Sequence, residues 1–494
     1  MTPELSPLRP PAAARQPSAT LQSLIGALHL RPGTTLAPHG AAALDAEGPI
    51  HGGRPALASR LAAGRPADDW PALVGRLHSL CSGAHTLAAT LALQAARAGI
   101  HHRLQDDVNG LDAMGSMDGT DGTDDGDRPA GHAIARLPAG LPAVDPRRHV
   151  WRPDALARQH LTWSTAREQA LRLAHDGPAR LGGGPAAAEL TRSLHGSPWL
   201  HPLAEGADVG SCQARRAEAA AWVDAHWCGG RSADWLAAWD DGGGPALAAQ
   251  LSCADTPLAR WLTALWPALS RLATPHRPLD LLDHGRLAFE RLGRDLATPG
   301  WTRRPQWQQT VPDTGPWSRH HAPRRHRMAE AGSRLLARLV DLLQLLQPDI
   351  HLGSAPSAPP VAHTGANSGH EDPIGSAPAA FGAARLACGA VQLDDGAGLA
   401  WVETARGLLL HRLRLAAGSG GRHLAEAQVL APTEWNFHPR GTLAQALCEL
   451  PASAEGARGA QGLAFAYDPC MPCTIDPAAG PPTADPTSEE IRHA

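Results

Sequence analysis

Lysine is absent from this chain: all 44 basic residues among its 494 are arginine. P-loop phosphate binding, pyridoxal Schiff bases and lysine nucleophiles are therefore excluded, because each of them needs a lysine amine. A strong positive charge is missing as well, since the formal net charge is −4. Nucleic-acid binding needs a concentrated positive field. We therefore expect no nucleic-acid partner.

Long apolar runs and export signals are also lacking. No stretch of about 18 uncharged apolar residues occurs, so we expect no membrane span. The first residues, MTPELSP, lack the basic-then-apolar pattern of a secretory signal. The eight cysteines have irregular spacing in a long chain, which is not typical of a disulfide framework. These absences together predict reduced thiols and a cytoplasmic protein.

Glycine and proline are abundant, with 51 and 45 residues, so extensive loops and disordered insertions are expected. Composition and periodicity divide the chain into seven segments. They are a flexible N-terminal segment (1–66) with one helix near 21–30, an N-terminal cysteine motif and helix (67–103), an acidic low-complexity insertion (104–148), a helical core (149–347), a linker (348–380), a small sheet with a C-terminal cysteine motif (381–476) that packs with 67–103 in one domain, and a disordered tail (477–494).

The periodicity predicts an α+β fold that is mainly α. Segment 328–347 repeats leucine and valine at helical spacing and is stopped by Pro348. Beyond Arg385 the period changes to two, with turn residues between the apolar runs. We therefore expect a helical core and a small antiparallel sheet near the C-terminus, with strands near 390–393, 399–404, 409–415 and 426–430. His411, among leucines on one strand face, is interpreted as a hydrogen-bonded core histidine.

Two short cysteine stretches stand near opposite ends of the chain. The first is RLHSLCSGAH, which contains Cys81, and the second is DPCMPC, which contains Cys470 and Cys473. A helix over Thr86–Arg97, stopped by Gly99, would place Cys81 at or just before a helix N-terminus. The helix dipole lowers the pKa of a thiol there and favours thiolate.

Several chemistries are open to these cysteines. The C-x-x-C stretch could be a redox dithiol, but only 21 residues follow Cys473, too few to complete a thioredoxin-like domain. His78, Cys81, Cys470 and Cys473 are acceptable ligand types for structural zinc. Unliganded cysteines in a pseudoenzyme that docks other proteins are a further reading.

The two stretches resemble the paired motifs of the [NiFe]-hydrogenase large subunit, R-x-C-G-x-C-x-x-x-H and D-P-C-x-x-C. Three more segments resemble that family in the same order: DTGPWSR (313–319) its G-P-L-A-R region, ETARGLLLH (403–411) its E-A-P-R-G strand and turn, and APTEWNFHPR (431–440) its P-[ST]-T-W-N-x-x-P-R segment. The resemblance covers 76 to 473 in five pieces and implies a hydrogenase-large-subunit-like helical core.

In that family each cysteine pair supplies one terminal nickel ligand and one thiolate that bridges nickel and iron. The resemblance puts the bridging positions on Cys81 and Cys473 and the terminal ones on His78 and Cys470. One of four cysteines is thus replaced, and no complete nickel site is expected. Soft thiolates suit a low-spin iron that carries cyanide and carbon monoxide. We expect Cys81 and Cys473 within about 4 Å, sharing one iron at roughly 2.3 Å each, with Cys470 assisting capture or release.

The resemblance also implies residues around the diatomic ligands. Arg406 matches an arginine beside the cyanides, Thr433 matches a hydroxyl donor to a cyanide nitrogen, and His85 matches a histidine that hydrogen-bonds a bridging sulfur. Asp476 stands where the family has a histidine. The C-terminal metal site and the processing signal of the family are therefore expected to be lost.

A large-subunit frame with one nickel ligand missing is similar to the HupK/HoxV-type hydrogenase maturation proteins. That resemblance implies a non-enzyme, an assembly scaffold or chaperone that carries Fe(CN)2(CO) as transient cargo. The partners it implies are the hydrogenase large-subunit precursor and the iron–cyanide delivery chaperones. An active hydrogenase is not expected.

Overall fold

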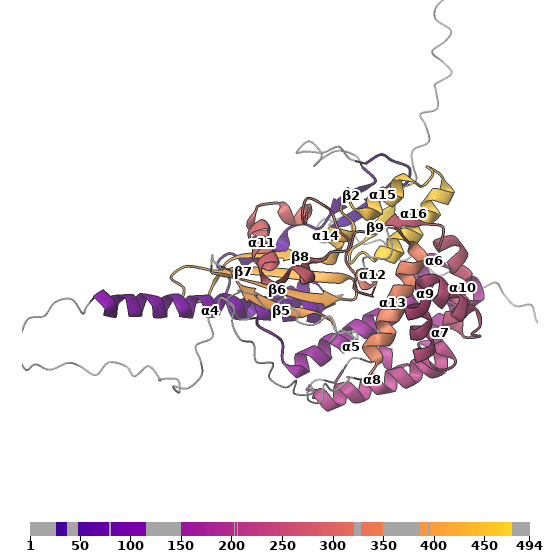
Figure 1. The fold of residues 1–494 in the computed structure, drawn as a ribbon, viewed down its shortest axis with the longest axis horizontal. Coiled ribbons are helices and arrows are strands. Elements are labelled where there is room, and N and C mark those ends of the chain that lie inside the picture. Colours follow the sequence, from indigo (N-terminus) through magenta and orange to yellow (C-terminus); the bar gives the residue numbers. More distant parts are fainter. Residues whose placement is uncertain are drawn as a thin grey trace, which may run out of the picture.

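The computed structural model describes residues 26–36, 48–78, 81–114, 150–201, 203–204, 206–320, 328–348, 386–393 and 396–476. Its elements are mostly helices, with small sheets beside them (Figure 1). The α+β, mainly α prediction is confirmed. Three predicted segments lie largely or wholly outside the described residues. They are the acidic insertion beyond 114, the linker beyond Pro348 and the tail (477–494).

The central sheet has four antiparallel strands in the order β5-β6-β7-β8. They run over Cys388–Gln392, Ala397–Thr404, Gly407–Leu415 and Leu424–Leu430. This agrees with the four predicted strands. Every residue of β6 is buried, because both faces of the sheet are covered. Leu409 and Leu413 of β7 pack in the cluster that contains helix α4, whereas Leu408 and Leu410 pack toward helix α11 (Gly285–Ala297).

Helix α4, Ser82–Met114, lies along one face of this sheet (Figure 1). Small side chains let the two elements approach: Ala92 of α4 is fully buried, and a Cβ on Gly398 of β6 would overlap the Ala92 carbonyl oxygen. The predicted stop at Gly99 is wrong, since the helix continues to Met114. A single glycine costs a helix only about 1 kcal/mol, which does not end it.

A second layer consists of helices packed around α13, which is almost wholly buried. Tryptophans fill this layer, and Trp199, Trp227 and Trp261 are fully buried. The helices, partly visible on the right of Figure 1, are α5 (Ala155–Leu171), α7 (Gly184–Ser193), α8 (Val209–Val223), α9 (Ser232–Ser252), α10 (Pro257–Leu269), α13 (Ala331–Leu346), α15 (Thr442–Cys448) and α16 (Ala454–Tyr467).

The two ends of the chain meet in a three-stranded sheet of order β2-β1-β9. Its strands are β1 (Ala27–Leu30), β2 (Ile50–Gly53) and β9 (Cys473–Ile475). The helix predicted near 21–30 is a strand over its described part. The first 66 residues also contain helix α2, Leu57–Ala62. Alternate residues of β1 pack into the core, and Leu30 is 0% exposed.

Within the described residues, none of the helices combines the length and the apolar character needed to cross a bilayer.

Candidate functional site

A cavity of about 510 Å³ lies between the two cysteine segments. Its wall includes His78 and Cys81 from the first segment and Cys470 from the second. Its charged lining consists of Arg54, Arg172, Arg180 and Glu434. The fold therefore brings parts of the chain almost four hundred residues apart to one cavity.

The first segment is a turn between helix α3, Trp70–Leu77, and α4. His78 caps α3, with its backbone N–H donating to the Val74 carbonyl (3.1 Å), and the Cys81 N–H donates to the His78 carbonyl (3.1 Å). These two hydrogen bonds make a tight turn that places both side chains on the cavity wall.

The Cys81 thiol does not behave as its position before α4 predicts. Burial, with smaller contributions from the charges of Cys470 and Glu434, raises the pKa of Cys81 to about 11, although Arg406 and Arg54 lower it. Removal from water outweighs the helix dipole here, because desolvation penalises the charged form most strongly. The predicted preference for thiolate is wrong, and Cys81 is a neutral thiol at pH 7.

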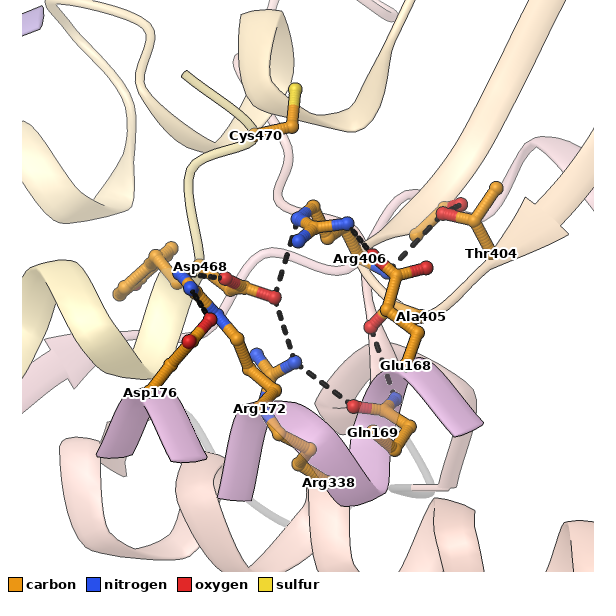
Figure 2. Close-up of polar contacts among 12 residues, drawn as sticks. Glu168, Gln169, Arg172, Asp176, Arg338, Thr404, Ala405, Arg406, Asp468 and Cys470 are labelled. Carbon is orange, nitrogen blue, oxygen red and sulfur yellow. Dashed lines mark hydrogen bonds and ion pairs between the residues drawn. The ribbon is translucent and has the colours of Figure 1, made fainter. Parts of the chain in front are cut away.

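The second segment leaves the end of α16 at Asp468, whose φ of +54° turns the chain sharply. The Asp468 side chain is completely buried and forms ion pairs with Arg172, Arg338 (2.8 Å) and Arg406 (3.3 Å). Burial alone would raise the pKa of Asp468, but these three guanidinium groups hold it well below its usual range. Figure 2 shows this cage, with the Cys470 sulfur pointing away from it.

Cys470 is held by two side chains. Arg54 Nη2 donates a hydrogen bond to its Sγ at 2.7 Å. The Thr433 hydroxyl lies 2.9 Å from the same sulfur and accepts from the Cys470 backbone N–H at 3.2 Å. Thr433 belongs to helix α14, Pro432–Asn436. The structure therefore places the predicted Thr433 directly at a predicted metal ligand.

Arg406 stands in the tight turn between β6 and β7. A Cβ at the next residue, Gly407 (φ +131°), would collide with Thr314, so only glycine suits this turn. The guanidinium contacts Asp468 and Glu168 and lies between Cys470 and Asp468 in Figure 2. Burial alone would lower the pKa of Arg406, but Asp468, Cys470 and Cys81 raise it. Arg406 therefore belongs to the cage, and its positive charge also interacts with the thiols of Cys470 and Cys81.

His85 forms a histidine cluster behind the cavity. Its ring stacks on His78 with centroids 3.8 Å apart, and its Nδ1 is 3.0 Å from His411 Nε2. Burial lowers the pKa of both His85 and His411, the latter to about 3, so both rings are neutral. The core interpretation of His411 is confirmed. His85 Nε2 is buried and, among the described residues, has no hydrogen-bond partner.

Cys473 is not brought to this cavity. It opens strand β9, opposite Leu28 of β1, and packs against the helical core, whereas Cys81 packs against the cluster of α4 and the sheet. The pKa of Cys81 responds to Cys470, while that of Cys473 is raised to about 11 by burial and is lowered only by Arg180. Of the three predicted metal ligands, Cys81 and Cys470 therefore line the cavity, whereas Cys473 is not part of its lining.

Two cavity residues were missed from the sequence. Arg54 also lies 2.5 Å from His78 Nδ1 through its Nη1, and nothing in the HGGRP stretch marks it as functional. Glu434 Oε1 lies 3.8 Å from Arg54 Nε, and burial raises the pKa of Glu434 despite that arginine. An available signal was the charged residue in APTEWN, where the hydrogenase pattern has threonine.

The zinc interpretation is not supported by a preformed site. Across the described part of the chain, the donors of His78, Cys81, Cys470 and Cys473 do not form a group of three within 4.8 Å. All eight cysteines are free.

Sequence comparison with known proteins shows the family to which this chain belongs. The hydrogenase expression/formation protein HoxV of Cupriavidus necator is 30% identical over 443 residues, which cover 86% of this chain and 92% of that protein. The chain belongs to the HoxV/HupK family. Another relative, HupK of Rhizobium leguminosarum bv. viciae, is 42% identical over 98 residues, 19% of this chain and 25% of that protein. No family model matches the chain.

Solved hydrogenases resemble this HoxV/HupK-family chain only distantly. An NAD⁺-reducing [NiFe]-hydrogenase is 14% identical, covers 83% of this chain and 88% of its own, and has a TM-score of 0.38. The Ni-Fe-Se hydrogenase of Desulfomicrobium baculatum is 13% identical, covers 83% and 91%, and has a TM-score of 0.35.

Proposed function

We propose that this protein acts in [NiFe]-hydrogenase maturation as a scaffold that transiently holds an Fe(CN)2(CO) fragment before the large-subunit precursor receives it. The observation that carries the proposal is that Cys81 and Cys470 open into one cavity. Two thiolates are the anchors that such an iron needs, because soft sulfur ligands suit low-spin iron with strong-field partners.

The polar lining supports an anionic cargo. Arg54 faces the Cys470 sulfur and supplies a guanidinium that pairs well with charged ligands. At about 30 Å³ per water-sized group, the 510 Å³ cavity has room for an iron with three diatomic ligands.

The thiol chemistry supports transient holding. Because the pKa of Cys81 is about 11, its proton must leave when iron binds and returns when iron is released. That proton competition weakens binding at neutral pH. The role needs no chemical turnover, so we propose a non-enzyme. It would work in the cytoplasm with iron–cyanide delivery chaperones and the large-subunit precursor.

Infrared spectroscopy on anaerobically purified protein from cells that make the hydrogenase tests the proposal. We expect CO and CN⁻ bands in the wild type and their loss in Cys81→Ser and Cys470→Ser. Cys473→Ser should retain them, since Cys473 lies away from the cavity. Cys253→Ser is the matched control, because Cys253 is exposed at the end of α9.

Two outcomes would contradict this assignment. Loss of the bands in Cys473→Ser but not in Cys470→Ser would restore the pairing of Cys81 with Cys473. Absence of bands from the wild type, together with normal maturation in both cavity variants, would leave a metal-free docking factor.

A further inference from the structure

The sheet that joins the two ends of the chain carries three metal-binding side chains on one face. His29 of β1 lies directly opposite His51 of β2, and on its other side it lies opposite Thr474 of β9. Asp476 follows Thr474 by two residues, and its backbone N–H donates to the Leu30 carbonyl (2.9 Å). Because side chains alternate along a strand, this register places His29, His51 and Asp476 on the same side.

The side chains converge as the register requires. The imidazole rings of His29 and His51 are stacked, with centroids 4.8 Å apart and planes 12° apart. Asp476 Oδ1 lies 3.7 Å from His29 Nδ1, and Oδ2 lies 3.9 Å from His51 Nε2. One donor atom from each residue lies within 4.8 Å of the other two. Ligands at about 2.1 Å around a tetrahedral ion are about 3.4 Å apart, so small rotations suffice.

We propose that His29, His51 and Asp476 bind one divalent transition-metal ion of the Zn²⁺ class. Asp476, which predicted the loss of the hydrogenase C-terminal metal site, is thus a ligand in a different donor set. Two imidazoles and one carboxylate are a donor set for zinc and its neighbours, which accept nitrogen ligands, whereas Mg²⁺ prefers an all-oxygen shell. The side chains are 40%, 34% and 37% exposed, so the ion enters from solvent and keeps at least one water or an external ligand.

Two neighbours adjust this site. The Thr474 hydroxyl lies 2.9 Å from His29 Nδ1 and can turn to support the ring when the ion is bound. Arg31 Nε lies 3.5 Å from Asp476 Oδ2, which balances the carboxylate when the ion is absent and competes with it. The ion would link the N-terminal strands β1 and β2 to β9, the strand that immediately follows the cavity segment of Cys470.

Zinc titration of the metal-stripped full-length protein without an affinity tag tests this site. The Cys81→Ser/Cys470→Ser background removes the cavity thiols, so the result is independent of the proposed cargo. We expect isothermal titration calorimetry to show one Zn²⁺ more in this background than in the same protein with His29→Ala/His51→Ala. Asp476→Asn, which keeps the shape of the side chain, should weaken that site at least tenfold. His195→Ala is the matched control, because His195 is exposed and contacts only the Arg192 carbonyl nearby.

A second measurement keeps the test valid if the double variant folds poorly. Thermal unfolding should shift upward with Zn²⁺ in the background protein and in His195→Ala, but not in Asp476→Asn. Equal zinc stoichiometry and affinity in all variants would overturn the proposal. Displacement of Zn²⁺ by a hundredfold excess of Mg²⁺ would overturn the assignment to the zinc class.

Discussion

Two polar regions lie on either side of Cys470 and differ in how their charges are paired. In the cage below it, three arginines, Arg172, Arg338 and Arg406, meet Asp468, and the carboxylates of Asp176 and Glu168 balance the remaining charge. In the cavity above it, Arg54 faces a sulfur, and its nearest carboxylate, Glu434, is 3.8 Å away. The three cage arginines are matched by three carboxylates, whereas the closest partner of Arg54 among these groups is a thiol. Arg172 belongs to the cage and also reaches the cavity wall.

This difference shows how support and binding capacity are separated along one short segment. Asp468 fixes where the segment leaves α16, and Cys470, two residues later, reaches the cavity (Figure 2). A buried, fully paired charge is costly to disturb. A cavity with the neutral Cys81 thiol and a partly paired arginine can accept an incoming group without breaking such pairs. The predictions below test the two sides separately.

Asp468→Asn should have the largest effect. Removing one charge from a buried ion-pair group leaves the others uncompensated, so we expect the free energy of unfolding to fall by about 3–5 kcal/mol. Urea unfolding measures it. Asp255→Asn is the control, because Asp255 is exposed and its pair with Arg260 is worth about 1 kcal/mol or less. A loss below 1 kcal/mol at Asp468 would show that the cage is not what holds this segment.

The sequence predicted those parts of the fold that depend on local patterns. Alternating leucines gave the strands of the central sheet, and the leucine repeat gave α13. Strand β1 was missed because its stability comes from pairing with β9, whose residues lie more than four hundred positions away. A four-residue strand has too few residues to show a period on its own.

The candidate site was also predicted only in part, because part of it depends on long-range contacts that local sequence patterns do not reveal. The cysteine spacings identified Cys81 and Cys470, but the direction of Cys473 depends on the register of β9 against β1. Arg54 acts only through tertiary contacts with His78 and Cys470. The pKa of Cys81 was predicted with the wrong sign because burial, which spacing does not reveal, outweighs the helix dipole.

The next largest effect should be a loss of folding stability in acid, caused by His85 and His411 behind the cavity. Burial depresses the folded-state pKa of His411 to about 3 and lowers that of His85, whereas both take up a proton near pH 6.5 when unfolded. Their contribution to stability is therefore present above pH 6.5 and is lost as the pH falls toward 3. His411 should cost about 2 kcal/mol between pH 7 and 5, and His85 should add to the loss in the same direction. Chemical denaturation of the wild type and of His411→Gln measures this loss, and the variant should lose less. An equal loss in both proteins would contradict it.

The smallest effect on stability, and the most specific effect on chemistry, should come from Arg54→Ala. The variant should lose about 1 kcal/mol, as expected for a partly exposed pair, while alkylation of Cys81 by iodoacetamide slows. Burial sets the high pKa of Cys81, and Arg54 lowers it, so removing Arg54 raises it further. One pKa unit corresponds to about a tenfold lower thiolate fraction.

Glu434→Gln is the matched variant of opposite sign, because Glu434 raises the pKa of Cys81. Its alkylation should therefore be faster than in the wild type, with rates followed at pH 9 by mass spectrometry of the peptide that contains Cys81. Arg338→Ala, in the cage and outside the cavity lining, should destabilise the fold more than Arg54→Ala does and change the Cys81 rate less. If Arg54→Ala and Glu434→Gln shift the rate in the same direction, access to the thiol controls the reaction, and the cavity charges do not.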